Sequence, residues 1–199
     1  MKGTGRYFVA ALAAAELCAC SSALHEDMGK RLEKDGDMTQ AIVEYRKAVE
    51  DKPGSIQTHL LLGRALSKTG QLQEAEKELR KAVSLDEKSY ESHIALADCL
   101  VQRKLWSDAR SEFEVAAVYG VKNPEPARKI GLVLEQQGDV DGAIVKYRES
   151  IKIDPRYVEG HESLGIALSK KGDAKGARTA MEEAQRVKKE LAAETAVKQ

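Results

Sequence analysis

Aromatic residues are scarce in this sequence. They make up 5% of its 199 residues, and Trp106 is the only tryptophan. The interior must therefore be built mainly from alanine, leucine, valine and isoleucine, which suits helices that pack closely together. An excess of one charge is also missing, because 32 basic residues balance 32 acidic residues without a block of like charge. The sequence lacks the basic patch of a nucleic-acid-binding protein, so we expect no nucleic acid partner.

Motifs for catalysis and metal binding are missing as well. The sequence contains no glycine-rich phosphate loop, nucleophile elbow or paired carboxylate site. Metal ligands must converge on one ion, whereas the four histidines recur at one place of a repeated pattern and would be spread along the protein. These are His25, His59, His93 and His161. The repeated position predicts that these histidines pack between helices. Because catalytic and metal-binding motifs are missing, we expect a protein that is not an enzyme and that has no metal or cofactor.

What the sequence does contain is a period of 34 residues. Two sets of small residues return at this step, the second always twelve positions after the first. Small side chains let two antiparallel helices approach closely, so we interpret both sets as repeat-packing residues. The first set is Gly29, Gly63, Ala97, Gly131 and Gly165, and the second is Ala41, Ala75, Ala109, Ala143 and Ala177.

Larger residues and turn residues keep the same step. One larger apolar residue in each repeat is predicted to fill the space beside the small ones: Tyr45, Leu79, Phe113, Tyr147 and Met181. A glycine also follows the predicted first helix of four repeats, where a positive φ is favoured. These glycines are Gly36, Gly70, Gly138 and Gly172. Only the third repeat differs, with Lys104 at this position.

The whole pattern resembles the tetratricopeptide repeat, a helix-turn-helix unit. The resemblance implies an all-α fold, a right-handed α-solenoid of five tandem repeats in which each repeat buries the face of its neighbour. The repeats are assigned to residues 22–55, 56–89, 90–123, 124–157 and 158–191. Residues 192–199 extend the last helix. The predicted helices are 23–35, 39–52, 56–69, 73–85, 90–103, 107–119, 124–137, 141–153, 158–171 and a last one from about 175.

The first twenty residues differ in composition from the rest. Lys2 and Arg6 form a short basic region, and an apolar run follows from Tyr7 to Ala15. This order is typical of an export signal. The run is shorter than the ~20 residues that a membrane-spanning helix needs. Residues 1–19 are therefore predicted to be a signal peptide.

The end of this segment resembles the lipobox of bacterial lipoproteins, with Leu17 three residues before Cys20 and Ala19 between the two cysteines. The resemblance implies cleavage before Cys20 and its acylation, so that residues 20–21 form a lipidated N-terminus. Ser21, in place of an aspartate, implies a lipid anchor in the outer membrane of a bacterial cell envelope, facing the periplasm. Glu16 and Cys18 depart from the usual pattern. An ordinary cleaved signal and a hydrophobic N-terminus without signal function are the alternatives.

Members of the repeat family bind partners along a groove formed by the first helix of each repeat. The resemblance implies that the peptide-binding groove of this chain includes Leu60, Arg64, Ile94, Val101, Arg128, Leu132, Ile166 and Lys170. Aliphatic side chains there predict an apolar or amphipathic partner segment, and the basic ones predict acidic groups around it. The alternative is that some aliphatic residues turn into the helix interface, because an error of one position rotates a side chain by about 100°.

Repeats combined with an anchor indicate an adaptor that docks a protein or peptide segment. The combination resembles the pilotin and assembly lipoproteins of pilus systems, which implies a role in assembling or localising a pilus or secretion machine. The alternatives are a scaffold for cell-wall hydrolases and an accessory subunit of a glycosyltransferase or protease. The oligomeric state does not follow from the sequence.

Overall fold

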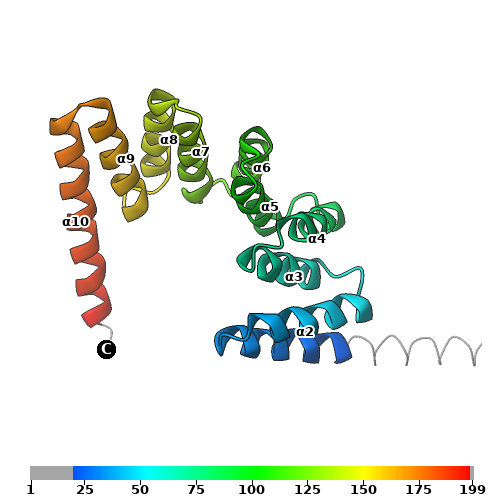
Figure 1. Cartoon of the computed structure of the whole chain (residues 1–199). Coiled ribbons are helices and arrows are strands. Elements are labelled where there is room, and N and C mark those ends of the chain that lie inside the picture. The colour runs from blue at the N-terminus through cyan, green and yellow to red at the C-terminus, as the bar shows by residue number, and fades with distance from the viewer. Residues whose placement is uncertain (1–19, 198–199) are drawn as a thin grey trace, which may run out of the picture. The chain divides into compact units, whose positions relative to one another are not determined.

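The computed structural model describes residues 20–197 of the chain, so the predicted signal peptide lies outside the described residues. Within this part all regular structure is α-helical. The chain divides into two compact units, Met1–Cys99 and Leu100–Gln199. Each unit is built from helix pairs joined by short turns (Figure 1).

The first unit begins, in its described part, with a helix over residues 20–34. It continues with α2 (Met38–Asp51), α3 (Ile56–Lys68) and α4 (Leu72–Leu85), and the boundary between the units falls inside α5 (Tyr90–Gln102). The second unit contains α6 (Trp106–Tyr119), α7 (Glu125–Gln136), α8 (Val140–Ile153), α9 (Val158–Lys171) and α10 (Ala174–Val197). The predicted helix boundaries agree with these to one residue, except that the chain is already helical at Cys20.

The two helices of a repeat touch where a small residue of the first faces a large residue of the second. A Cβ atom added to Gly131 would lie 2.5 Å from Cε1 of Tyr147, and one added to Gly63 would lie 2.6 Å from Cγ of Leu79. Both large side chains are fully buried. The same contact joins Gly29 to Tyr45 and Gly165 to Met181, and Ala41, Ala75, Ala97, Ala109 and Ala143 are buried. The fifth repeat follows the predicted packing less closely, because Ala177 is half-buried and Met181 is 38% exposed.

In most turns inside the repeats, a glycine with positive φ is followed directly by the residue that caps the N-terminus of the next helix. Gly138 has φ 84°, and the following residue, Asp139, accepts a 2.8 Å hydrogen bond from the backbone N–H of Gly142. This carboxylate satisfies one of the N–H groups that the start of α8 leaves unpaired. The Gly-Asp sequences at 36–37 and 172–173 do the same for α2 and α10. In the third repeat Lys104 adopts the left-handed conformation with φ 60°.

The histidines pack between helices, as the sequence predicts. Nδ1 of His59 lies 2.7 Å from Oε2 of Glu78 on α4, and its Nε2 lies 2.9 Å from the carbonyl oxygen of Pro53. His59 thus joins a second helix to the turn that precedes its own helix. His161 makes the corresponding bond to the carbonyl oxygen of Pro155 at 3.0 Å. Among residues 20–197 no three His, Cys, Asp or Glu side chains gather in a way that could hold a metal ion.

Replacing Lys104 by glycine should stabilise the protein. A left-handed conformation costs a side chain with a Cβ about 1–2 kcal/mol, and glycine avoids most of this strain while losing part of the gain to backbone entropy. We expect Lys104→Gly to raise the free energy of unfolding by about 0.5–1 kcal/mol in urea denaturation. The control, Gly138→Lys, should lower it, because it introduces the strain that the first variant removes. Equal effects of the two variants would contradict this account.

Replacing Gly131 by alanine should destabilise the protein, although alanine favours a helix by about 1 kcal/mol over glycine. The new Cβ meets the ring of Tyr147, which is buried and whose hydroxyl is bonded to Glu135. We expect Gly131→Ala to lower the free energy of unfolding by about 1–3 kcal/mol, the usual range for overpacking. Gly54→Ala is the control, because a Cβ there meets nothing within 4 Å. A stabilised Gly131→Ala protein would show that these helices do not touch as described.

Candidate functional site

The first unit does not expose its predicted groove leucine and isoleucine. Leu60 is 5% exposed and Ile94 is 7% exposed. The prediction that these two side chains line an open groove is wrong, and the alternative, that they belong to the core, holds. For Leu60 the reason is that α3 packs against both α2 and α4, so that only a narrow face of this helix reaches solvent. Arg64 is exposed on that face.

The second unit does expose aliphatic side chains at the predicted places. Leu132 on α7 is 38% exposed, and Ile166, at the same position of the next repeat on α9, is 48% exposed. Helices α7 and α9 contact each other. Met181 of α10 is exposed too, and it lines with Ile166 a hollow of about 380 Å³ between α9 and α10. We call Leu132, Ile166 and Met181 the apolar strip.

The basic residue beside the strip is held by a carboxylate. Nζ of Lys170 lies 3.3 Å from Oε1 of Glu135, and the other oxygen of Glu135 accepts a 2.9 Å hydrogen bond from the hydroxyl of Tyr147. Burial and this bond raise the pKa of Tyr147. The predicted groove residue Lys170 is therefore exposed but already paired. Arg178, which lines the same hollow, has no hydrogen bond or ion pair within residues 20–197.

The same network occurs three repeats earlier in the first unit. Nζ of Lys68 lies 2.5 Å from Oε1 of Glu33, whose other oxygen accepts a 2.9 Å bond from Tyr45. The hydrogen bond from Lys68 lowers the pKa of Glu33. A carboxyl whose pKa is lowered on folding stabilises the protein above its unfolded pKa, and this contribution is lost as the pH falls. In both units the lysine joins the first helices of successive repeats.

Two further predicted groove residues have structural partners. Nε of Arg128 donates a 2.8 Å hydrogen bond to the hydroxyl of Tyr157, and the guanidinium carbon lies 5.9 Å from the centroid of that ring. Burial raises the pKa of Tyr157. Arg128 therefore positions the start of α9 as well as facing solvent in part. Val101, at the end of α5, is half-buried.

The two described cysteines lie in opposite environments. Cys20 is exposed, and Ser22, two residues later, is buried and donates a 3.2 Å hydrogen bond to the carbonyl oxygen of Ala48. The predicted lipidation site is thus joined to the repeats almost without a linker. Cys99 is buried, and burial raises the pKa of its thiol, which makes it a poor nucleophile. No helix among residues 20–197 is both long and apolar enough to cross a membrane.

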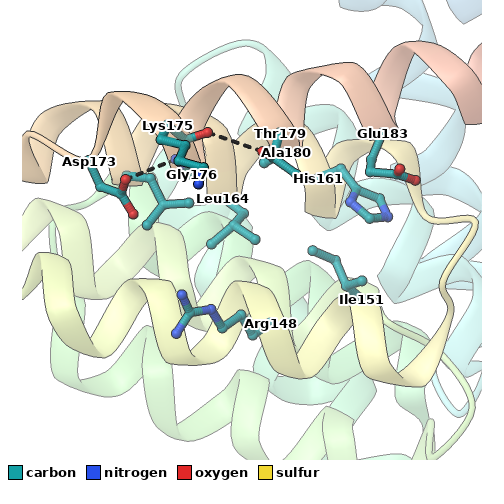
Figure 2. A pocket seen from close by; sticks show the side chains of 11 residues that line it. Arg148, Ile151, His161, Leu164, Asp173, Lys175, Gly176, Thr179, Ala180 and Glu183 are labelled. Carbon is teal, nitrogen blue, oxygen red and sulfur yellow. Dashed lines mark hydrogen bonds between the residues drawn. The ribbon is translucent and has the colours of Figure 1, made fainter.

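One hollow was not found from the sequence. It lies between α8, α9 and α10 and has a volume of about 500 Å³ (Figure 2). Its lining combines polar and charged residues, among them Arg148, His161 and Glu183, with aliphatic and small residues such as Leu164 and Gly176. We call this hollow the α8–α10 pocket. The sequence does contain a sign of this pocket. Glu74 and Glu78 of the second repeat are replaced in the fifth repeat by the much smaller Gly176 and Ala180.

Antiparallel helix pairs with small residues at their contacts define this protein as an α-helical repeat protein. Family models agree: a model described as TPR repeat matches residues 123–172, and a model described as tetratricopeptide repeat matches residues 32–86 and 70–129. The chain belongs to the tetratricopeptide repeat family. This fold indicates an adaptor for protein–protein interaction, and neither model describes a catalytic family.

Solved structures show the same fold. A crystal structure of MamA is 27% identical, with a TM-score of 0.71, and the match covers 82% of this chain and 96% of that one. The structure of pilF from Pseudomonas aeruginosa is 20% identical, with a TM-score of 0.74 and coverage of 85% and 78%. YrrB, described as a TPR protein with an unusual peptide-binding site, is 17% identical, with a TM-score of 0.62 and coverage of 82% and 84%. No curated protein matches the chain.

Proposed function

We propose that this chain is a lipid-anchored adaptor of a bacterial cell envelope, and that its second unit docks an apolar or amphipathic segment of another protein. The observation that carries the docking site is the apolar strip. Solvation alone would favour polar side chains at exposed positions, yet Leu132 and Ile166 stand at equivalent, exposed positions of successive first helices. Exposed apolar residues that gather on one face are typical of interaction surfaces.

The charges around the strip define the partner further. Lys170 is neutralised by Glu135, whereas Arg178 is exposed and has no partner within residues 20–197. The partner segment is therefore mainly apolar, with an acidic residue placed to meet Arg178. That charge contributes more to the rate of association and to the choice of partner than to affinity.

The anchor rests on the order of residues that ends at Cys20 and on the exposure of that cysteine. Because Ser22 is already docked on α2, an acylated Cys20 would hold the first repeat close to the membrane surface. A single acyl chain binds membranes only marginally, so the proposal includes acylation of both the sulfur and the new amine. The fold shared with pilF is compatible with a pilus or secretion machine as the destination.

Glutamates in the apolar strip should remove partner binding without unfolding the protein. Leu132→Glu combined with Ile166→Glu places two charges in the proposed contact, while both positions are exposed enough to solvate them. We expect an unchanged melting curve and loss of the proteins that co-purify with the wild-type chain from membranes, measured by quantitative mass spectrometry.

The matched control carries Val118→Glu and Val145→Glu. These valines are more exposed than the strip residues, lie in the same unit, and belong to the second helices α6 and α8. The control should retain the partners. Loss of the same proteins from both double variants, or their retention by the strip variant, would refute the docking site.

Cys20→Ser should abolish lipidation. The variant should fail to incorporate labelled palmitate and should leave the membrane fraction, because sulfur acylation requires this cysteine. Cys99→Ser is the control: that thiol is buried beneath the carbonyl oxygen of Leu72, at 3.5 Å, and should be irrelevant to labelling. Label retained by Cys20→Ser would refute the anchor and leave the docking site untouched.

A further inference from the structure

In the first unit, two glutamates of one helix pair with two basic residues of other helices. We call these four residues, Arg46, Glu74, His59 and Glu78, the template. The guanidinium of Arg46 on α2 makes two contacts with the carboxylate of Glu74 on α4, at 2.7 and 3.0 Å. Four residues along α4, the carboxylate of Glu78 lies 2.7 Å from Nδ1 of His59. Residues four apart lie on one face of a helix, roughly 6 Å apart along its axis. Two carboxylates at that spacing therefore bind one arginine and one histidine.

The second unit keeps the basic groups of this template and lacks the acidic ones. Three repeats further along the chain, Arg148 stands at the position of Arg46 and His161 at that of His59. Gly176 and Ala180 replace the two glutamates. Arg148 has no hydrogen bond or ion pair within residues 20–197.

His161 keeps one of the two bonds of the template. Its Nε2 lies 3.0 Å from the carbonyl oxygen of Pro155, as Nε2 of His59 lies 2.9 Å from that of Pro53. A carbonyl oxygen only accepts, so Nε2 carries a proton and donates. Nδ1 is then the ring atom on the side where the template holds a carboxylate, and here that side opens into the pocket.

The α8–α10 pocket is the space that the two glutamates would fill. Arg148 on α8 and His161 on α9 line it, while α10 contributes the small residues Gly176 and Ala180 (Figure 2). Its volume of about 500 Å³ is enough for the ends of two acidic side chains. The pocket is thus the place where the second unit lacks the two carboxylates that pair with an arginine and a histidine in the first unit.

The two acidic residues that line the pocket already accept hydrogen bonds from groups of α10. Oδ1 of Asp173 accepts a 2.8 Å bond from the backbone N–H of Gly176, as the cap of α10. Oε2 of Glu183 accepts bonds of 2.7 and 3.0 Å from Arg186, and these bonds, with a smaller attraction to His161, lower the pKa of Glu183. The basic Lys175, which also lines the pocket, is exposed and its ammonium has no ion pair within residues 20–197. The charges of this pocket that have no ion pair within residues 20–197 are those of Arg148 and Lys175, and both are positive.

We infer that the α8–α10 pocket binds two carboxylates of an acidic helical segment in a partner protein, a second site distinct from the apolar strip. One carboxylate accepts two hydrogen bonds from the guanidinium of Arg148, a geometry that arginine favours with carboxylates. The other accepts a hydrogen bond from Nδ1 of His161 in its imidazolium form. Glutamates four residues apart on a helix match the spacing of Gly176 and Ala180, whose acidic counterparts fill this role in the second repeat.

The test uses the full chain and a labelled, alanine-based helical peptide that carries two glutamates four residues apart. Binding is followed by fluorescence anisotropy at low salt. An otherwise identical peptide with glutamines at both positions should bind at least about tenfold more weakly, because charge-assisted hydrogen bonds to arginine are lost. Arg148→Gln should weaken binding of the acidic peptide to a similar extent. The control Lys152→Gln removes the same charge from the next turn of α8, outside the pocket, and should leave binding nearly unchanged.

A second variant separates binding from folding. Ala180→Glu restores the glutamate of the template beside His161, so the chain supplies one of the two carboxylates itself. We expect this variant to keep or raise its melting temperature and to lose binding of the acidic peptide. Equal binding of the glutamine peptide, equal effects of Arg148→Gln and Lys152→Gln, or unchanged binding to Ala180→Glu would each overturn the inference. Glutarate binding as tightly as the peptide would also overturn it, by assigning the pocket to a small dicarboxylate.

Discussion

Close contact between the two helices of a repeat is the constraint on which the rest of this structure depends. The backbone at Gly131 lies against the ring of Tyr147 so closely that not even a methyl group fits between them. Such contacts gain dispersion energy only at close range, and they leave no room to shift one helix along the other. Because the register inside each pair is fixed in this way, side chains one period apart occupy equivalent places, and both the Glu-Tyr-Lys networks and the histidine bonds recur.

This constraint explains why the fold could be predicted from the sequence. Glycine and alanine at a constant step, followed by one larger residue in each repeat, specify which helix faces meet, and glycine occupies four of the turn positions that have a positive φ. Lys104, the exception, adopts the same left-handed conformation without being a glycine. The first helix was predicted to begin at residue 23, and this was wrong, because the chain is already helical at Cys20.

The candidate site could be predicted only in part, for a physical reason. Leu60 and Arg128 occupy equivalent positions of their repeats, yet the first is buried and the second faces solvent in part. Exposure of a first helix depends on how its neighbours cover it, which is a property of tertiary packing and not of the period. Arg128 could be placed on the right helix, but its bond to Tyr157 joins residues from two repeats and has no local signal. The α8–α10 pocket was not predicted, although Gly176 and Ala180 stand where the second repeat has Glu74 and Glu78.

The local hydrogen bonds of the turns allow such a chain to gain or lose whole repeats. Each Gly-Asp turn is closed by its own backbone and side-chain hydrogen bonds, as at Gly138 and Asp139, and owes little to distant residues. A segment removed or duplicated between two such turns therefore rejoins the chain with the same backbone geometry at the junction. Recombination between equivalent turns would add or delete one complete period at a time, and the parts of the chain on either side would not need new loops to accommodate the change.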